Sequence, residues 1–264
     1  MNKLLITSLL ASLAFSDDLF ISEYIEGSYS NKTIEIYNGT GATVDLSGYA
    51  IKQSHDGTGW GPDGDGGGCE TPDGMHYVLI LDGHTIPPDD VFVIANSQAN
   101  NQITDVADIL LAYGCGDGLK VAAFNGNDGM GLFKDCNDAG CTTGTLIDVI
   151  GRGVETEQGC DDNGDPEPCP WEVAGVSQAT EDHTLVRKSN VTSGNINWVV
   201  SAGTNADNSE WIVYDSDTFD YIGYHGDGEP PQTEGCMDPS AANYNPNATI
   251  ACDDYDGDEI CDDI

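Results

Sequence analysis

Short runs of alternating apolar and polar residues fill most of the chain between residues 17 and 226. A period of two is typical of β-strands, and turn residues separate the runs at intervals of roughly 10–15 residues, as in sandwiches and barrels. Helical periodicity is scarce, and only residues 97–111 could hold a short helix. The pattern therefore predicts a two-layered, all-β domain. Its predicted strands are Phe20–Ile25, Thr33–Tyr37, Gly48–Lys52, His76–Leu81, Val91–Ala95, Lys120–Phe124, Gly131–Lys134, Leu146–Ile150 and His183–Arg187.

The two ends of the chain depart from this alternation. Residues 1–16 combine a positive start at Lys3, an apolar run to Phe15 and small residues at its exit, which together predict a cleaved signal peptide. That run is shorter than the roughly 20 residues that a spanning helix needs, and no second run of its length follows, so we expect a secreted protein without a membrane span. Gly and Pro punctuate residues 227–234, which we interpret as a linker. After it come a small module (235–252) and an acidic tail (253–264).

The charge balance is extreme: 8 Lys and Arg stand against 46 Asp and Glu, a formal net charge of -38 at pH 7. A negative field of this strength repels phosphate backbones, so we expect no direct binding of nucleic acid. Self-repulsion also opposes a compact state unless cations or a salty medium offset it. The acidity therefore favours bound cations, although plain solubility of a secreted protein would also explain it.

Nine cysteines in an exported chain predict disulfides. Zinc is the alternative, but the chain has no paired CxxC and its five His are scattered. The sequence does not determine connectivity, and an odd cysteine, Cys261, is left over. The candidate pairs are Cys136 with Cys141, Cys160 with Cys169, Cys236 with Cys252, and, over a longer range, Cys69 with Cys115.

A series of segments in chain order resembles the lamin tail domain of secreted bacterial proteins. The resemblance implies an immunoglobulin-like β-sandwich that serves as a binding or accessory module, often beside secreted nucleases or phosphoesterases, and it implies no catalytic residues. Two cysteine-bearing regions depart from the family, namely the insertion 54–75 and the short loops at 136–141 and 160–169. The matching segments are Phe20–Gly27, Lys32–Asn38, Val44–Tyr49, Ile86–Asn96, Phe124–Asp128, Gly131–Phe133, Leu146–Gly151, His183–Lys188, Glu210–Trp211 and Asp217–His225.

The acidic tail carries a candidate calcium loop that resembles a thrombospondin type 3 repeat. Asp254, Asp256 and Asp258 occupy positions 1, 3 and 5 of this loop, Ile260 offers a carbonyl at 7, and Asp262 offers a carboxylate at 9. Calcium takes six to eight oxygens, which alternate residues of a tight loop direct inward. A glutamate replaces the family's usual glycine and position 12 falls past residue 264, so we expect weak affinity and a chain cut from a longer protein. The alternative is a solvated acidic tail.

Two further segments carry recognisable motifs, a small module near the C-terminus and a second candidate calcium loop. Residues 235–249 resemble the small GC-x-DP-x-A-x-NY-N-P module of secreted marine bacterial proteins. Within the loop closed by Cys160 and Cys169, Asp161, Asn163 and Asp165 have the alternate spacing of calcium ligands. Neighbouring prolines restrict that loop, so a plain acidic loop is the alternative.

Catalytic signatures are weak. The chain contains no H-E-x-x-H, G-x-S-x-G or phosphate-cradling glycine motif. Glu23 and Glu35 lie in adjacent predicted strands, where a carboxylate pair for glycoside cleavage is conceivable, but satisfied structural glutamates are the commoner reading. Trp60 and Trp171 lie in the Gly- and Pro-rich insertions and are candidates for a sugar platform.

These patterns predict a secreted, non-catalytic binding or structural module that takes up calcium and binds an extracellular protein or glycan. The alternative is an accessory domain of an extracellular nuclease or phosphohydrolase whose catalytic region follows residue 264.

Overall fold

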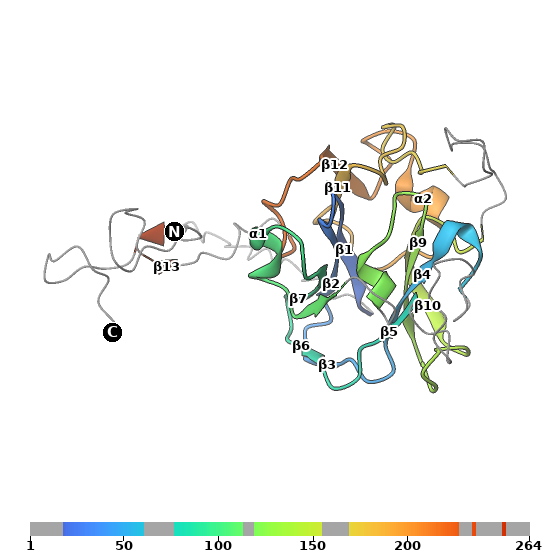
Figure 1. Ribbon diagram of the computed structural model, residues 1–264, viewed down its shortest axis with the longest axis vertical. Coiled ribbons are helices and arrows are strands. Elements are labelled where there is room, and N and C mark those ends of the chain that lie inside the picture. Colours follow the sequence, from blue (N-terminus) through green and yellow to red (C-terminus); the bar gives the residue numbers. More distant parts are fainter. Residues whose placement is uncertain are drawn as a thin grey trace, which may run out of the picture.

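The structure is a computed structural model that describes residues 18–60, 77–112, 119–154 and 169–226, together with the backbone of 234–235 and 250–251. Two β-sheets pack face to face, which confirms the prediction of an immunoglobulin-like sandwich (Figure 1). Helices within these residues are short. The predicted domain boundaries stay predictions.

The larger sheet has six strands. All neighbours in it are antiparallel except the last pair, β7 and β8, which is parallel. The alternating pattern had predicted β1, β2, β7 and β11, but neither edge strand. In sheet order the strands are β12 (Trp211–Asp215), β11 (His183–Arg187), β1 (Phe20–Glu26), β2 (Lys32–Asn38), β7 (Asp90–Asn96) and β8 (Ile109–Leu111).

The smaller sheet has four antiparallel strands: β10 (Thr145–Ile150), β9 (Gly129–Lys134), β4 (Ala50–Ser54) and β5 (Val78–Ile80). Two two-residue pairs stand apart from both sheets. These are β3 (Val44–Asp45) with β6 (Thr85–Ile86), and β13 (Glu234–Gly235) with β14 (Ile250–Ala251). The helical segments are η1 (His55–Gly57), α1 (Asn101–Thr104), η3 (Leu119–Ala122) and α2 (Trp198–Ala202).

One predicted strand, Lys120–Phe124, is wrong. Residues 119–122 form the 3-10 helix η3, and Val121, Ala122 and Phe124 are all buried in the sandwich core. A strand would send Val121 and Ala122 to opposite faces, whereas the helical turn buries both on one side. The side-chain amide of Asn96 donates to the carbonyl of Ala122 at 2.9 Å, which satisfies a backbone group that a sheet ladder would otherwise pair.

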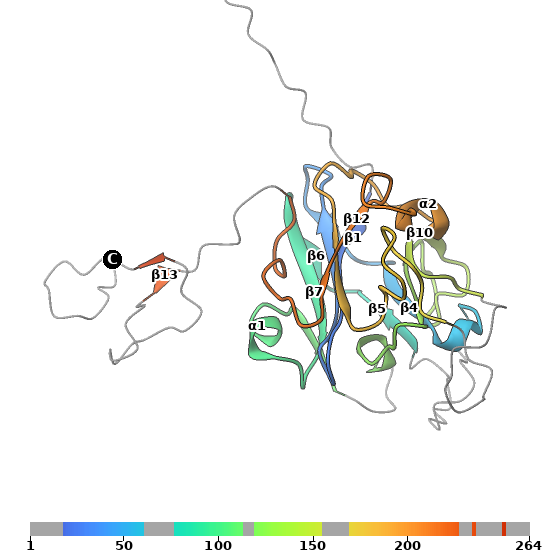
Figure 2. The ribbon, with the colours of Figure 1, turned by 90° about the horizontal axis from the view of Figure 1, so that it is seen from above.

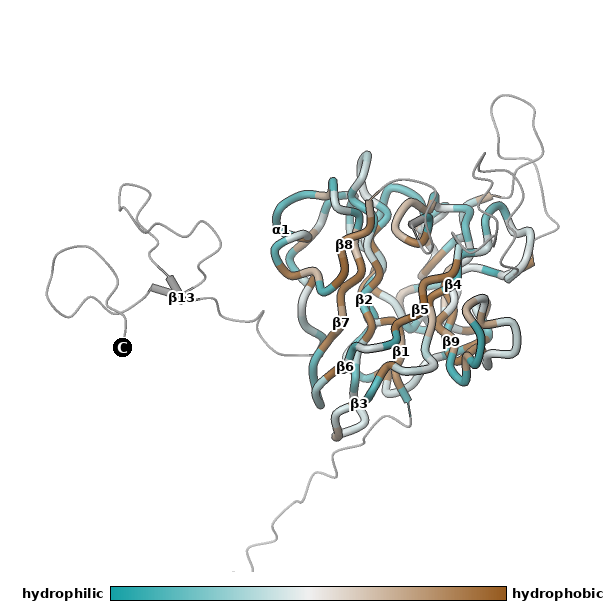
Figure 3. Tube along the Cα trace, turned by 60° about the horizontal axis from the view of Figure 1, so that its bottom comes forward, coloured by the Kyte–Doolittle hydropathy of each residue, from teal (hydrophilic) through white to brown (hydrophobic). Residues whose placement is uncertain are grey.

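The space between the sheets is an apolar core. Ile21, Ile34 and Ile94 of the larger sheet belong to one buried cluster with Ile51 and Leu132 of the smaller sheet. Figure 3 shows the strands of both sheets as the most hydrophobic stretches of the chain. This inner face of the six-stranded sheet is where the alternation of the sequence buries its apolar side chains.

A buried ion pair joins the two sheets inside that core. Arg187 of β11 and Asp148 of β10 are paired and fully buried, and a second nitrogen of Arg187 lies 2.7 Å from Glu210. The guanidinium lies 4.0 Å from the ring centroid of Trp211, and its Nε donates to the carbonyl of Ile21 at 3.1 Å. Most hydrogen-bonding groups of this ion pair therefore have partners, as the burial of charged groups requires.

The opposite, outer face of the six-stranded sheet is covered by α1 and by the segment 216–226 (Figure 2). We call the segment 216–226 the outer cover. The carboxylate of Asp217 accepts hydrogen bonds from Ser28 N and Asn31 Nδ2, both at 2.9 Å, and so ties this cover to the β1–β2 turn. The apolar cluster beneath it consists of Ile25, Val93, Ala95, Ile103, Phe219 and Ile222.

Among the described residues, no helix has the length and hydropathy that crossing a membrane would require.

Candidate functional site

The calcium ligands expected from the sequence lie outside the described residues, so both calcium loops stay predictions. The residues concerned are Asp161, Asn163, Asp165, Asp254, Asp256, Asp258, Ile260 and Asp262.

One disulfide lies within the described part of the chain, between Cys136 and Cys141 in the β9–β10 connection. Cys169 is disulfide-bonded too, to a partner outside the described residues. Disulfide formation, expected from an exported chain, is therefore confirmed at these positions. The remaining candidates, Cys69, Cys115, Cys160, Cys236, Cys252 and the odd Cys261, lie outside the described residues.

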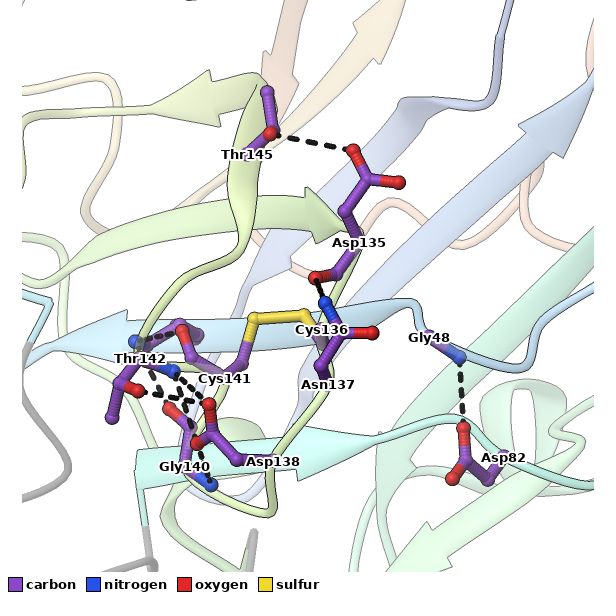
Figure 4. The surroundings of a disulfide bond; sticks show 11 residues. Gly48, Asp82, Asp135, Cys136, Asn137, Asp138, Gly140, Cys141, Thr142 and Thr145 are labelled. Atoms are coloured by element: carbon purple, nitrogen blue, oxygen red, sulfur yellow. Dashed lines mark hydrogen bonds between the residues drawn. A yellow bond between two sulfur atoms is a disulfide. The ribbon is translucent and has the colours of Figure 1, made fainter.

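The loop closed by this disulfide is held by its own hydrogen bonds (Figure 4). The carboxylate of Asp138 accepts from Gly140 N at 3.0 Å and from the hydroxyl of Thr142 at 2.8 Å. The ammonium of Lys52 donates to the carbonyls of Gly140 and Cys141. Hydrogen bonds from Thr142 lower the pKa of the exposed Asp138 carboxyl, so that carboxylate is already engaged within the loop.

A cleft of about 490 Å³ lies between this loop and the edge strand β5. Its walls are Val78–Ile80 with Asp82 on one side and Cys136–Ala139 on the other. The described residues that line it include no histidine or serine of the kind that nucleophilic or acid–base catalysis would use.

A second hollow of about 490 Å³ is lined partly by exposed apolar side chains, and we call it the Trp60 groove. It lies where the end of η1, the end of β10 and the start of α2 meet. Three of its aliphatic side chains are strongly exposed: Val154 at 67%, Ile196 at 63% and Val199 at 58%. Arg152 is the basic side chain among the described residues that line it.

The two tryptophans singled out from the sequence differ in exposure. Trp60 lines the groove, with its ring edge-on to Phe133 at 5.5 Å between centroids. Gly153 lies flat against its indole, since an added Cβ would come within 2.1 Å of Nε1. Trp171 is only 9% exposed and packs in the same close way on Gly151. Trp171 therefore offers little surface for stacking on a sugar, and Trp60 offers part of one.

The carboxylate pair expected from the sequence is present. Glu23 of β1 and Glu35 of β2 are directly opposite each other, on the outer face of the six-stranded sheet. Glu35 accepts from the hydroxyl of Ser22 at 2.6 Å and from Gly223 N of the outer cover at 2.7 Å. Neither carboxylate oxygen of Glu23 has a hydrogen-bond partner among the described residues.

Both glutamates are buried, at 1% exposure or less. Burial raises the pKa of Glu35 to about 8, with hydrogen bonds from Ser22 and Gly223 acting in the opposite direction. Burial also raises the pKa of Glu23 well above its usual value, and the neighbouring charges of Glu35 and Asp220 add to that effect. Burial thus favours the protonated form of both carboxyls beneath the cover, and a sugar would reach them only if the cover moved.

Comparison with known proteins adds the family. The family model described as the lamin tail domain matches residues 14–153, just over half of the 264-residue chain. The chain belongs to the lamin tail domain family. This is a non-enzymatic, immunoglobulin-like domain family, in agreement with the sandwich.

One solved structure similar to this lamin tail domain protein is that of a DUF4876 family protein from Bacteroides thetaiotaomicron. The two are 13% identical, with a TM-score of 0.41, and the alignment covers 80% of this chain and 74% of the other. No curated protein matches the chain significantly.

Part of the groove lies beyond the residues that match the lamin tail domain. Ile196 and Val199 come from the segment that enters α2, for which the sequence pattern predicted neither a helix nor a site. Their only signal is a pair of apolar residues among asparagines, and that pattern is equally common in buried turns. Only their exposure, which depends on the neighbouring strand ends, distinguishes them.

Proposed function

We propose that this lamin tail domain is an exported, non-catalytic binding module, and that its Trp60 groove binds a protein partner. Single exposed apolar residues are normal on protein surfaces, but a group of them around a hollow marks an interaction site. The exposed group formed by Val154, Ile196 and Val199 is the observation that carries this proposal.

The chemistry of the groove favours a protein over a glycan. Sugar sites present open aromatic faces beside several polar groups, whereas Gly153 covers part of Trp60 and the rest of the rim is largely aliphatic. Branched aliphatic side chains match the apolar centre of a protein interface. Because the chain carries a formal charge of -38, we expect the partner's surface around this apolar centre to be basic.

A non-catalytic role is supported by the position of the acidic pair. Glu23 and Glu35 are the carboxylates whose spacing in adjacent strands invites acid–base chemistry, yet both lie beneath the outer cover. A general acid must reach the substrate oxygen within hydrogen-bond distance, which this arrangement prevents. Their protonated state serves the packing of the cover instead.

Export and calcium uptake belong to the same proposal. The signal-like residues 1–16 and the disulfide of Cys136 with Cys141 support an oxidising, extracellular compartment. The acidic loops around Asp161 and Asp254 would take up calcium and offset part of the charge. A nuclease or phosphohydrolase region beyond residue 264 stays an alternative that longer sequence would decide.

The groove can be tested directly with the fluorescent apolar probe ANS. We expect the double variant Ile196→Asn with Val199→Asn to lose most of the ANS fluorescence of the wild-type chain. Ile212 is the matched control, because it is an exposed aliphatic residue (40%) on the edge strand β12 and lies outside the groove. Equal fluorescence in the wild type and the double variant would remove the apolar groove from the proposal.

The partner itself can be captured by a photo-crosslinking amino acid placed at position 196, with position 212 as the control. We expect an adduct specific to position 196 in the medium of the source organism, with a protein whose isolated form binds the wild type at least about tenfold more tightly than Val199→Asp. A glycan-array signal lost in Trp60→Ala, without any such adduct, would replace the protein partner with a glycan. Hydrolysis of a phosphodiester or glycoside by the purified chain would overturn the non-catalytic role.

A further inference from the structure

A second site is assembled where β4 ends and β9 begins. These strands are antiparallel neighbours, with Ser54 opposite Gly129. His55 and Asp56 follow β4 in η1, and Asp128 is the residue directly before β9. The fold therefore joins residues that are more than 70 positions apart in the chain, and Asp56 N donates to Asp128 Oδ1 at 2.9 Å.

Three side chains that can ligate metals converge there. One ligand atom from each of His55, Asp56 and Asp128 lies within 4.8 Å of the other two. The Nδ1 of His55 is 3.1 Å from Asp56 Oδ2 but has no hydrogen-bond partner among the described residues. The imidazole nitrogen and the carboxylate oxygen are close enough to contact one ion.

Two buried amides supply an independent observation. Gln53 is 2% exposed and its Nε2 donates to Asp128 Oδ2 at 2.7 Å, while Asn127 is 8% exposed and its Nδ2 donates to Asp56 Oδ1 at 3.2 Å. The oxygens of both amides have no hydrogen-bond partner among the described residues. A buried acceptor without a donor costs about 1–3 kcal/mol, so both amide oxygens remain available to a water molecule that a bound cation would hold.

The donor set identifies the class of ion. Calcium and magnesium prefer shells of oxygen atoms alone, whereas an imidazole nitrogen beside carboxylates suits zinc and its neighbours. The three ligand atoms lie within 4.8 Å of one another, close enough to share one ion, and the formal charge of -38 favours any cation. His55 and Asp56 are partly exposed, so the fourth position opens to solvent.

We propose that His55, Asp56 and Asp128 bind one divalent transition-metal ion, Zn²⁺ by its donor set, with Gln53 and Asn127 as outer partners. The ring of His55 also packs, tilted, against the buried Tyr77 at 5.3 Å between ring centroids, which limits the movement of the imidazole. This site is separate from the predicted calcium loops. Water, or a donor group from a bound partner, would complete its coordination.

The test is a Zn²⁺ titration of the purified, oxidised chain, read by competition with a chelating dye in the presence of millimolar Ca²⁺. Calcium occupies acidic loops that offer only oxygens, so the zinc that still binds reports a site with nitrogen. We expect one Zn²⁺ per chain, and an affinity at least about tenfold lower in His55→Gln and in Asp56→Asn. Tetrahedral absorption bands of Co²⁺ bound to the wild type should vanish in both variants.

His84→Gln is the matched control, because His84 is also half-buried and packs edge-on against an aromatic ring, Phe92. It should leave zinc affinity unchanged. Asp128→Asn is a poor first test, since the Asp128 carboxylate also accepts from Asn125 N, Asp56 N and Gln53 Nε2 and its loss could unfold the turn. Zinc binding that is absent in the wild type, abolished by calcium, or equal in the wild type and in both variants would overturn the proposal.

Discussion

The two faces of the six-stranded sheet differ in how they accommodate buried carboxyl groups. On the inner face, the carboxylate of Asp148 meets Arg187 and accepts from the backbone N–H groups of Ile21, Val149 and Asn195. On the outer face, Glu23 is equally buried but has no hydrogen-bond partner among the described residues.

The difference shows what burial alone does to a carboxyl group. Where a cation and several donors surround it, the group joins the two layers through an ion pair and hydrogen bonds. Where the cover supplies one backbone N–H to Glu35 and, among the described residues, nothing to Glu23, desolvation raises both pKa values. The stability that the outer face contributes therefore depends on pH.

The largest expected effect comes from removing the inner cation. Arg187→Met would leave Asp148 buried without its counter-charge, and we expect a loss of about 3–5 kcal/mol in the free energy of unfolding. Urea denaturation followed by tryptophan fluorescence measures it. The double variant Arg187→Met with Asp148→Asn should recover part of the loss, and a single-variant loss below about 1 kcal/mol would break the comparison.

A smaller, pH-dependent effect is expected on the outer face. Burial raises the pKa of both glutamates above 4.5, and that of Glu35 to about 8. The contribution of Glu35 to stability is fully present below pH about 4.5 and is lost as the pH rises through about 8, and the contribution of Glu23 is lost with rising pH in the same direction. A glutamine cannot ionise, so Glu23→Gln should be more stable than the wild type at pH 9, by on the order of 1–3 kcal/mol, and should gain little at pH 5.

Urea midpoints at pH 5, 7 and 9, at constant ionic strength, measure this difference. Glu172→Gln is the control, because Glu172 is exposed and its substitution should give the same difference from wild type at every pH. If Glu23→Gln is no more stable than the wild type at pH 9, the outer carboxyls are solvated after all.

The smallest effects should have opposite signs on the two faces. Thr33 is fully buried on the outer face and its hydroxyl has no hydrogen-bond partner among the residues that the structure describes, so Thr33→Val should stabilise the chain by about 0.5–1 kcal/mol. On the inner face, the hydroxyl of Tyr24 donates to the carbonyl of Thr180 at 2.9 Å, so Tyr24→Phe should cost about 0.5–1.5 kcal/mol. Thermal melts of both variants at pH 7 check the pair, and equal signs would contradict it.

The predicted strands agree with the observed ones where a short stretch of sequence carries the whole signal, and they disagree where it does not. β11 matches its predicted bounds because the β-branched and apolar residues of His183–Arg187 stand between two stretches of polar residues. β8 lies within residues 97–111, where the sequence pattern predicted a short helix, and only α1 of that range is helical. β12 was missed because Trp211–Asp215 places aromatic and branched residues on both sides of an edge strand.

The sequence by itself determined the all-β architecture and the family, and it placed Glu23 and Glu35 in consecutive predicted strands, because alternation is a local property that short windows record. Only the tertiary structure decided where those side chains go. A bulge between Ile21 and Glu23 turns Ile21 inward and Glu23 outward, although strict alternation would place both on one face. The approach of His55 to Asp128 likewise depends on strand pairing, which no local pattern encodes.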